Sequence, residues 1–402
     1  MHSSNIIIVG GGMTGGMLAI LLADQGMRVT VLDASPAPHI PSADAQLRVS
    51  TLTEASHWLL RNSGVWQHLD PERVCPYASM RVWDEEGSGD LSFFATDADA
   101  EALGWLLENQ HLSAALYQAA ATRDNLDWHS NMTVEGIQRT PEGWHVLTPD
   151  RTWAADLLVG ADGGPSRIRE WAGLAGSPKD TGHHALVATV HTEKRHDQCA
   201  RQVFLPSGPL ALLPLFGDGQ QCNIVWSTWP DHCAHLRSLD DAAFSQALTQ
   251  ATGEQLGQCQ VLSPRPSFAI QERHASSYSA PHLVLVGDAA HVIHPLAGQG
   301  VNLGLMDAAV LAEELGRARA AGLACHDARI LARYERRRRG ENLMMQNAMR
   351  VIKTTFERNE LPLRWLRNSG MNAINRMPPL RQLFVHQALG RGGDVPALAR
   401  RR

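Results

Sequence analysis

The residues most able to do chemistry near the start of the chain form a glycine-rich turn. Residues 10–15 read Gly-Gly-Gly-Met-Thr-Gly. In a strand–turn–helix unit with this spacing, Gly10 permits the turn, Gly12 lets the backbone approach a pyrophosphate, and Gly15 lets the helix pack closely on the strand. Asp33 stands about 20 residues on, where an acid accepts hydrogen bonds from a ribose. The pattern predicts a bound dinucleotide.

The flanking sequence predicts the elements that would hold this turn. Asn5 to Val9 is a short apolar run typical of a buried parallel strand. Met13 to Gln25 has the pattern of a helix, and Arg28 to Leu32 predicts the next strand. The amides at the helix N-terminus would face the phosphates. The fingerprint occurs once and does not by itself distinguish NAD from FAD.

Two later segments repeat the strand-then-acid pattern. An apolar strand runs into Asp162, with Arg169 in the helix that follows, and another runs into Gly287 and Asp288. Ligands gather at the carboxyl ends of strands in open α/β sheets, so we expect Asp33, Asp162 and Asp288 along one rim. The alternative for the two later acids is that each only caps a helix.

Together the three segments resemble those of the class A flavoprotein aromatic hydroxylases, the group that includes para-hydroxybenzoate hydroxylase. Within that group the chain most resembles the ubiquinone-biosynthesis hydroxylases. The most specific part of the match is Leu296 to Gly304, supported by Glu108-Asn109 and by the stretch 361–364. The similarity covers nearly the whole chain.

The resemblance implies a set of site residues. Those implied to contact FAD are Gly10, Gly12, Gly15, Asp33, Arg48, Gln110, Asp162, Arg169, Gly287, Asp288, Gly300, Val301 and Asn302. Those implied to surround the flavin ring are Pro295, Gly298, Gln299 and Gly300, with His291 and His294 as weaker candidates to shape the site. The helix predicted from Val301 to Leu315 would direct its N-terminal amides at the ring and stabilise the anionic reduced flavin. No catalytic base is assigned and no metal is expected.

The resemblance also implies the reaction. We expect an FAD-dependent monooxygenase that uses NAD(P)H and O2, through a C4a-hydroperoxyflavin, to hydroxylate a polyprenylated phenol or quinol in ubiquinone biosynthesis. NAD(P)H needs no second nucleotide domain, because it docks transiently. Two alternatives stay open: a hydroxylase of a soluble aromatic compound, and a non-catalytic scaffold subunit of a biosynthetic complex.

The expected fold is α/β: a Rossmann-like FAD-binding domain interleaved with a mostly antiparallel substrate domain, followed by a helical tail. The FAD domain would comprise 1–75, 101–182 and 272–325, and the substrate domain 76–100 and 183–271. A basic helical region would span 326–402. The apolar run Leu210 to Phe216 either lines the substrate cavity, as the resemblance implies, or is plain core.

Composition and charge narrow the setting. The 402 residues include six scattered cysteines with no C-x-x-C pair, which suits reduced thiols in a cytoplasm. A strand begins within five residues of the start, so we expect no signal peptide. Residues 326–402 carry 17 Lys and Arg against 6 acidic residues, a net +11, whereas the other 325 residues carry −16.

Two interpretations of this basic tail remain open. Arginines with Trp and Leu after residue 361 have the composition of an interfacial helix, which would dock the protein peripherally on the inner face of a membrane. Otherwise the tail packs on the FAD domain, and the arginines 336–339 pair with acids or face water. The expected partners are a lipophilic aromatic substrate, O2, and either a membrane surface or other ubiquinone-biosynthesis proteins. No nucleic acid is expected.

Overall fold

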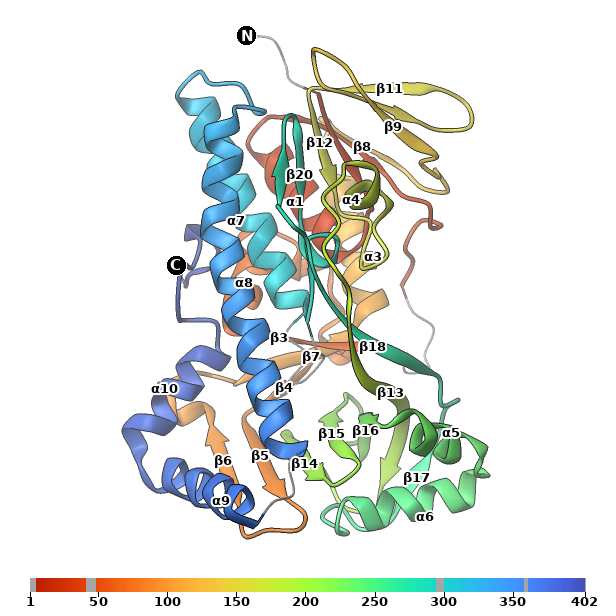
Figure 1. The fold of residues 1–402 in the computed structure, drawn as a ribbon, viewed down its shortest axis with the longest axis vertical. Coiled ribbons are helices and arrows are strands. Elements are labelled where there is room, and N and C mark those ends of the chain that lie inside the picture. Colours follow the sequence, from red (N-terminus) through yellow and green to blue (C-terminus); the bar gives the residue numbers. More distant parts are fainter. Residues whose placement is uncertain (1–4, 41–47, 294–299, 358–360, 402) are drawn as a thin grey trace.

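The computed structural model describes residues 5–40, 48–293, 300–357 and 361–401. The molecule is elongated, with a parallel sheet and its helices in the upper part of Figure 1 and a larger antiparallel sheet in the lower part. Two long strands, β13 (Lys179–Thr192) and β18 (Ser267–His274), run from one part into the other.

The upper sheet has six strands in the order β19-β20-β12-β1-β2-β8. Neighbouring strands are parallel except for β19 and β20. The short apolar runs form these strands because both faces are covered, which favours continuous apolar sequence. The bounds are β1 (Asn5–Val9), β2 (Arg28–Leu32), β8 (Leu126–His129), β12 (Leu157–Gly160), β19 (Ser279–Ala280) and β20 (Leu283–Leu285).

Three helices pack together beside this sheet. They are α1 (Met13–Asp24), α3 (Asn109–Ala120) and α7 (Gly300–Ala320), and α1 contacts the other two. The central residues of α1 are buried all round, because α1 lies in the core and not at the surface. The shorter α2 (Glu54–Asn62) begins after Thr53, whose hydroxyl accepts a hydrogen bond from the Ser56 amide.

Two small antiparallel sheets complete the upper part and its border. One is a meander of β9 (Gly136–Arg139), β10 (Trp144–Leu147) and β11 (Thr152–Ala155). The other has the order β3-β7-β4 and lies between the two large sheets in Figure 1. Its strands are β3 (Val49–Leu52), β7 (Gly104–Glu108) and β4 (Cys75–Tyr77).

The lower sheet follows the order β21-β18-β13-β16-β15-β14-β5-β6, with β17 paired to β13. All its printed pairings are antiparallel except that of β14 with β5. The remaining bounds are β5 (Ser79–Asp84), β6 (Asp90–Phe94), β14 (Cys199–Leu205), β15 (Gly208–Pro214), β16 (Gln221–Thr228), β17 (Cys259–Val261) and β21 (His291–Val292).

The two faces of the lower sheet have different surroundings. Leu210 and Leu212 on β15 belong to a buried core that α5 (Pro230–Ser238) and α6 (Asp241–Ala251) complete. Ala211 and Leu213, which alternate with them, line a cavity on the other face. Residues 210–213 therefore alternate between core and cavity wall, and the assignment of this cavity to the substrate stays a prediction.

The C-terminal region is helical and packs along the molecule. α8 (Ala328–Glu357) lies against α7 and extends toward the lower part, as Figure 1 shows. α9 (Leu361–Arg376) lies against β6, and α10 (Pro378–Ala388) lies against the short 3-10 helix η3 (Ala95–Ala98). The tail therefore contacts both large parts of the molecule.

Many tail arginines form ion pairs with acids. Examples are the pairs Arg333–Glu314, Arg337–Asp394, Arg339–Glu335, Arg350–Glu272, Arg381–Asp97 and Arg391–Glu54. In most of these pairs the acid is largely buried while the arginine is partly exposed. Most of these pairs join the tail to the rest of the molecule. They therefore hold the tail in place and neutralise part of its positive charge.

The predicted α/β class with a helical tail is confirmed, and so are the strands at Asn5–Val9 and Arg28–Leu32. The domain boundaries stay a prediction. Among the described residues, no helix is both long and apolar enough to cross a membrane.

One fully buried ion pair joins α7 to α8. Arg338 Nε lies 2.7 Å from Asp307 Oδ1, and both side chains are at most 1% exposed. Arg338 also binds Glu341 and donates to Asn342 Oδ1 at 3.0 Å. A buried charge without its partner is strongly destabilising, so this contact ties the tail to the body.

We predict that Arg338→Leu lowers the free energy of unfolding by about 3 kcal/mol, because Asp307 stays buried without its cation. The matched control is Arg336→Leu, an exposed position on the same helix, with an effect within about 0.5 kcal/mol. Urea unfolding followed by tryptophan fluorescence measures both. Equal effects of the two substitutions would contradict this role for the buried pair.

Candidate functional site

The first glycine turn, residues 10–15 after β1, is packed directly on the second turn, residues 160–164 after β12. Gly10 has φ +104°, and a Cβ there would lie 2.3 Å from the carbonyl oxygen of Ala161. A Cβ on Gly15 would lie 2.0 Å from the Gly10 oxygen. Both positions therefore require glycine for reasons of backbone contact alone. Gly12 differs, because a Cβ there meets no protein atom within 4 Å.

Asp33 lies at the carboxyl end of β2 and is joined to the first turn. Its Oδ2 accepts a hydrogen bond from the Gly11 amide at 2.5 Å, and its Oδ1 accepts one from the Ser35 amide at 2.7 Å. Each carboxylate oxygen has a second lone pair, so Asp33 can also accept hydrogen bonds from ribose hydroxyls. The Trp128 ring packs against Gly11 and closes this corner.

A cavity of about 630 Å³ runs along the carboxyl ends of β1, β12 and β20. It begins at Gly12, Met13 and Thr14, where no side chain caps the N-terminus of α1. It continues past Gly163, Gly164 and Asp288 and ends at Gly300, Val301 and Phe268. An uncapped helix N-terminus offers amide donors and partial positive charge to a phosphate.

The third turn, residues 287–290 after β20, is packed on the first turn through Thr14. Gly287 has φ +59°, and a Cβ there would lie 2.8 Å from Thr14 Oγ1. A Cβ on Gly304 of α7 would lie 2.3 Å from the same oxygen. Asp288 follows this turn and borders the cavity, where the residue is exposed. Surrounding protein still raises the pKa of its carboxyl by desolvation.

Asp307 fixes the third turn from below. Its Oδ2 accepts hydrogen bonds from the Gly287 amide at 3.0 Å and from His291 Nε2 at 2.6 Å. Burial by itself would raise the pKa of this carboxyl, but His291 and Arg338 together hold it below its usual value. His291 is thus a buried partner of Asp307 and does not border the cavity in this structure.

The second turn has mainly a structural role in the described geometry. Asp162 accepts hydrogen bonds from Ser166 Oγ at 2.5 Å and from the Ile168 amide at 3.1 Å, at the start of α4 (Arg167–Trp171). This is the capping role that the sequence left as the alternative. Arg169 is buried and donates to the Ala289 and Gly164 oxygens at 2.9 and 2.8 Å, which joins the second turn to the third.

The other residues implied to contact FAD lie at different points. Arg48 borders a neighbouring cavity, and its guanidinium lies 5.8 Å from the centre of the Phe268 ring. Gln110 Nε2 lies 2.9 Å from His39 Nε2, and Gln110 does not line the first cavity. Asn302 accepts from the Thr53 amide at 2.9 Å and donates to the Thr51 oxygen at 2.7 Å, so its amide is engaged with protein.

Val301 and Gly300, at the start of α7, line the cavity, and a Cβ on Gly300 meets nothing within 4 Å. His294, Pro295, Gly298 and Gln299 lie outside the described residues. Their assignment to the flavin-ring environment stays a prediction, as do the individual FAD contacts.

A second cavity of about 380 Å³ lies between the lower sheet and the first cavity. The two share four wall residues, namely Val49, Asn109, Phe268 and Asp288. Its other walls are mainly apolar residues of β13, β14, β15 and β16, with α10 reaching it at Ala388. A molecule in this cavity therefore lies directly beside one in the first cavity.

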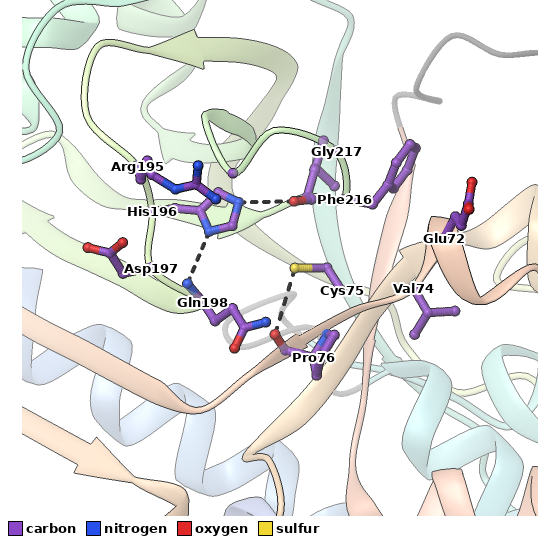
Figure 2. A pocket seen from close by; sticks show the side chains of 12 residues that line it. Glu72, Val74, Cys75, Pro76, Arg195, His196, Asp197, Gln198, Phe216 and Gly217 are labelled. Carbon is purple, nitrogen blue, oxygen red and sulfur yellow. Dashed lines mark hydrogen bonds between the residues drawn. The ribbon is translucent and has the colours of Figure 1, made fainter.

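A third cavity of about 460 Å³ is lined by Cys75 and Pro76 of β4 together with residues 195–198 and 215–217 (Figure 2). His196 is held there by two hydrogen bonds: Nε2 donates to the Leu215 oxygen at 3.0 Å, and Nδ1 accepts from the Gln198 amide at 3.1 Å. Burial lowers the pKa of the His196 ring. Arg201 donates to the His196 oxygen at 2.8 Å, so this loop positions a residue of the second cavity.

Comparison with known proteins assigns a class to this arrangement. The chain matches the family described as FAD binding domain over residues 3–348. It is 34% identical to 3-demethoxyubiquinol 3-hydroxylase of Escherichia coli K12, over 96% of this chain and 98% of that protein. It is 35% identical to ubiquinone hydroxylase UbiL of Rhodospirillum rubrum, over 99% and 92%. The crystal structure of p-nitrophenol 4-monooxygenase PnpA from Pseudomonas putida shares the fold with a TM-score of 0.77 at 18% identity, covering 96% and 98%.

Fold and site together define a flavin-dependent aromatic hydroxylase. The chain belongs to the FAD binding domain family, and it is a monooxygenase with FAD as cofactor and NAD(P)H as co-substrate. This outcome sets aside the interpretation as a non-catalytic scaffold.

The residues of the first cavity fit FAD. The glycines at 12, 163 and 300 leave open space where a side chain would intrude. The N-terminus of α1 faces that space and would hold the pyrophosphate, while Asp33 would hold the adenosine ribose. The N-terminus of α7 would lie at the flavin ring and stabilise negative charge there.

Sequence reasoning missed Asp307 and the buried role of Arg338. The available signal was an acid within an otherwise apolar face of the helix after Gly300, since a buried carboxylate needs a cation or donors. Arg338 was hidden in a run of four arginines, which does not distinguish a buried position from a solvated one.

We predict that Gly12→Ala leaves the apoprotein as stable as wild type but raises the Kd for FAD at least about tenfold, because the new methyl group fills space beside the pyrophosphate. Flavin fluorescence titration and urea unfolding measure the two quantities. The control Gly15→Ala should instead destabilise the apoprotein by about 1–3 kcal/mol through overpacking. Wild-type FAD affinity in Gly12→Ala would refute the placement of the pyrophosphate.

Proposed function

We propose that this monooxygenase hydroxylates the aromatic ring of a polyprenylated phenol or quinol in ubiquinone biosynthesis. Two relatives that align over nearly their whole length carry ubiquinol or ubiquinone hydroxylase in their names. The observation that carries the proposal is the shared wall between the FAD cavity and the apolar second cavity. A ring in the second cavity would therefore lie beside the FAD cavity, at the residues that line both.

The protein has two tasks in this reaction. FAD supplies the redox chemistry, taking a hydride from NAD(P)H and activating O2. The chain holds an electron-rich ring next to that chemistry and excludes water from it. The walls suit this task, because Val187, Ala211, Leu213 and Val225 present an apolar surface to the ring.

A route for the prenyl chain leads from the second cavity toward α10. Met80 and Ala388 line the cavity, and Met80 also packs with Phe93 in a cluster beneath α10. The Phe93 and Phe384 rings lie 6.4 Å apart. Apolar side chains therefore follow one another from the cavity to the surface, which supports a substrate with a long apolar tail.

The end of this path is an exposed apolar surface, the α10 ridge, which consists of Met377, Leu380, Leu383 and Phe384. Exposed apolar groups gathered in this way are typical of membrane or protein contacts. Because a polyprenyl phenol resides in a bilayer, we propose that the α10 ridge rests on the membrane surface and receives the substrate there. Protein partners of the same pathway would compete for this ridge.

We predict that the purified holoenzyme, given NADPH or NADH and 18O2, adds one 18O atom to a 2-prenylated phenol, as measured by mass spectrometry. Hydroxylation of water-soluble phenols with no turnover of the prenylated one would favour the soluble-aromatic alternative and contradict the lipid substrate.

We predict that the double substitution Leu383→Glu and Phe384→Glu reduces binding to vesicles of phosphatidylethanolamine and phosphatidylglycerol at least about fivefold in sedimentation assays, because charges replace buried apolar area. The control Leu262→Glu alters an exposed leucine next to β17, on the other side of the lower sheet, and should keep wild-type binding. Equal vesicle binding by all three proteins would argue against the α10 ridge as the docking surface.

A further inference from the structure

Two polar side chains of the lower sheet border the second cavity, whose lining also includes other polar residues such as Arg201 and Asn223. Gln202 on β14 is 7% exposed and Ser227 on β16 is 3% exposed. Arg201 donates to backbone oxygens, whereas within the described part of the chain neither Gln202 nor Ser227 forms a side-chain hydrogen bond. Their polar atoms are therefore open to the cavity, where a bound ligand would complete their hydrogen bonds.

The sheet register places both groups over the same space. On its cavity face, Gln202 pairs with Ala211, which pairs with Val225, and Val225 pairs with Val187. This row is apolar except for the amide. Ser227 follows Val225 by two residues on the same face, two strands away from β14. The two polar groups therefore lie on opposite sides of an apolar strip about 10 Å wide.

The chemistry of the two groups matches a phenol or quinol. An amide offers both a donor and an acceptor, and a hydroxyl does the same. A ring hydroxyl or methoxy oxygen needs these partners once water is excluded, whereas the ring itself needs only the apolar strip. A prenyl chain cannot satisfy either group, so the oxygen-bearing edge of the ring must face them.

We propose that Gln202 and Ser227 bind the ring oxygens of the substrate and thereby determine which ring carbon faces the flavin. The inference rests on the function proposed above and extends it to the orientation of the ring. Hydrogen bonds at two positions around a ring allow one rotation of it and exclude the others, whereas apolar walls alone allow several. Gln202 and Ser227 are specificity residues in this scheme, and the flavin wall at Val49, Asn109, Phe268 and Asp288 defines the reacting side.

The test compares Gln202→Met, which keeps the volume and removes the amide, with wild type. The control Gln260→Met makes the same change at an exposed position on β17 outside both cavities. The probes are a 2-prenylated phenol and its methyl ether, whose Kd values are read from the perturbation of the flavin absorption bands. Hydroxylated products are separated by chromatography to obtain the ratio of ring positions.

Wild type and Gln260→Met should prefer the phenol over its ether by about tenfold or more and give one main product. Gln202→Met should bind the phenol and its ether with similar Kd values and give products hydroxylated at several ring positions. It should also oxidise more NAD(P)H for each molecule of hydroxylated product. A merely structural role would weaken both probes equally and leave the product ratio unchanged, and that result would overturn the proposal. If Gln202→Met fails to fold, the smaller change Ser227→Ala is measured in the same way. It should likewise lose the preference for the phenol and give mixed products.

The proposal and the lipid substrate fail separately. If wild type accepts only a water-soluble phenol, the lipid substrate is wrong, and the same comparison with that phenol and its ether still supports or overturns the role of Gln202. If wild type hydroxylates the prenylated phenol and the variants keep both its preference and its product, the function stands and the orientation proposal is wrong.

Discussion

The site depends on the hydrogen bonds and the ion pair that the buried carboxylate of Asp307 forms. This carboxylate binds the Gly287 amide, His291 and Arg338 at once, and so connects the third turn, the strand after it and the C-terminal helix α8. The Asp307 side chain is fully buried, so its charge must be balanced by these neighbours and by Asn342, whose Nδ2 also donates to Oδ1 at 3.2 Å. The basic tail is therefore part of the structure that holds the FAD cavity and not an appendage to it.

The two large sheets border different cavities. Backbone turns at the ends of β1, β12 and β20 pack on one another through glycines, which leaves the uncapped N-terminus of α1 and the exposed carboxylate of Asp288 for a cofactor. The lower sheet gives one face to a core under α5 and α6 and the other to the second cavity. Because the two cavities share four wall residues, a ring in the second cavity would lie beside a cofactor in the first.

The sequence predicted the local elements well and the side-chain roles less well. Strands and turns at Gly10 and Gly287 follow from apolar runs and glycine spacing, which depend on nearby residues only. Asp162 as a helix cap rests on local contacts, and the sequence offered that role as an alternative. Asn302 as a bridge to β3 depends on a group far away in the chain, so spacing could not assign it. Gln202 and Ser227 were equally hidden, because alternation along a strand does not say which face borders a cavity.

The most direct test of the account is the rate of flavin reduction by NAD(P)H in the purified protein, followed by stopped-flow absorption with and without a prenylated phenol. The account predicts a visible flavin spectrum and a reduction rate that rises when the phenol fills the adjoining cavity. A bound flavin whose spectrum and reduction rate ignore every phenol tested would contradict the shared wall between the two cavities, and protein that takes up no FAD would contradict the site itself.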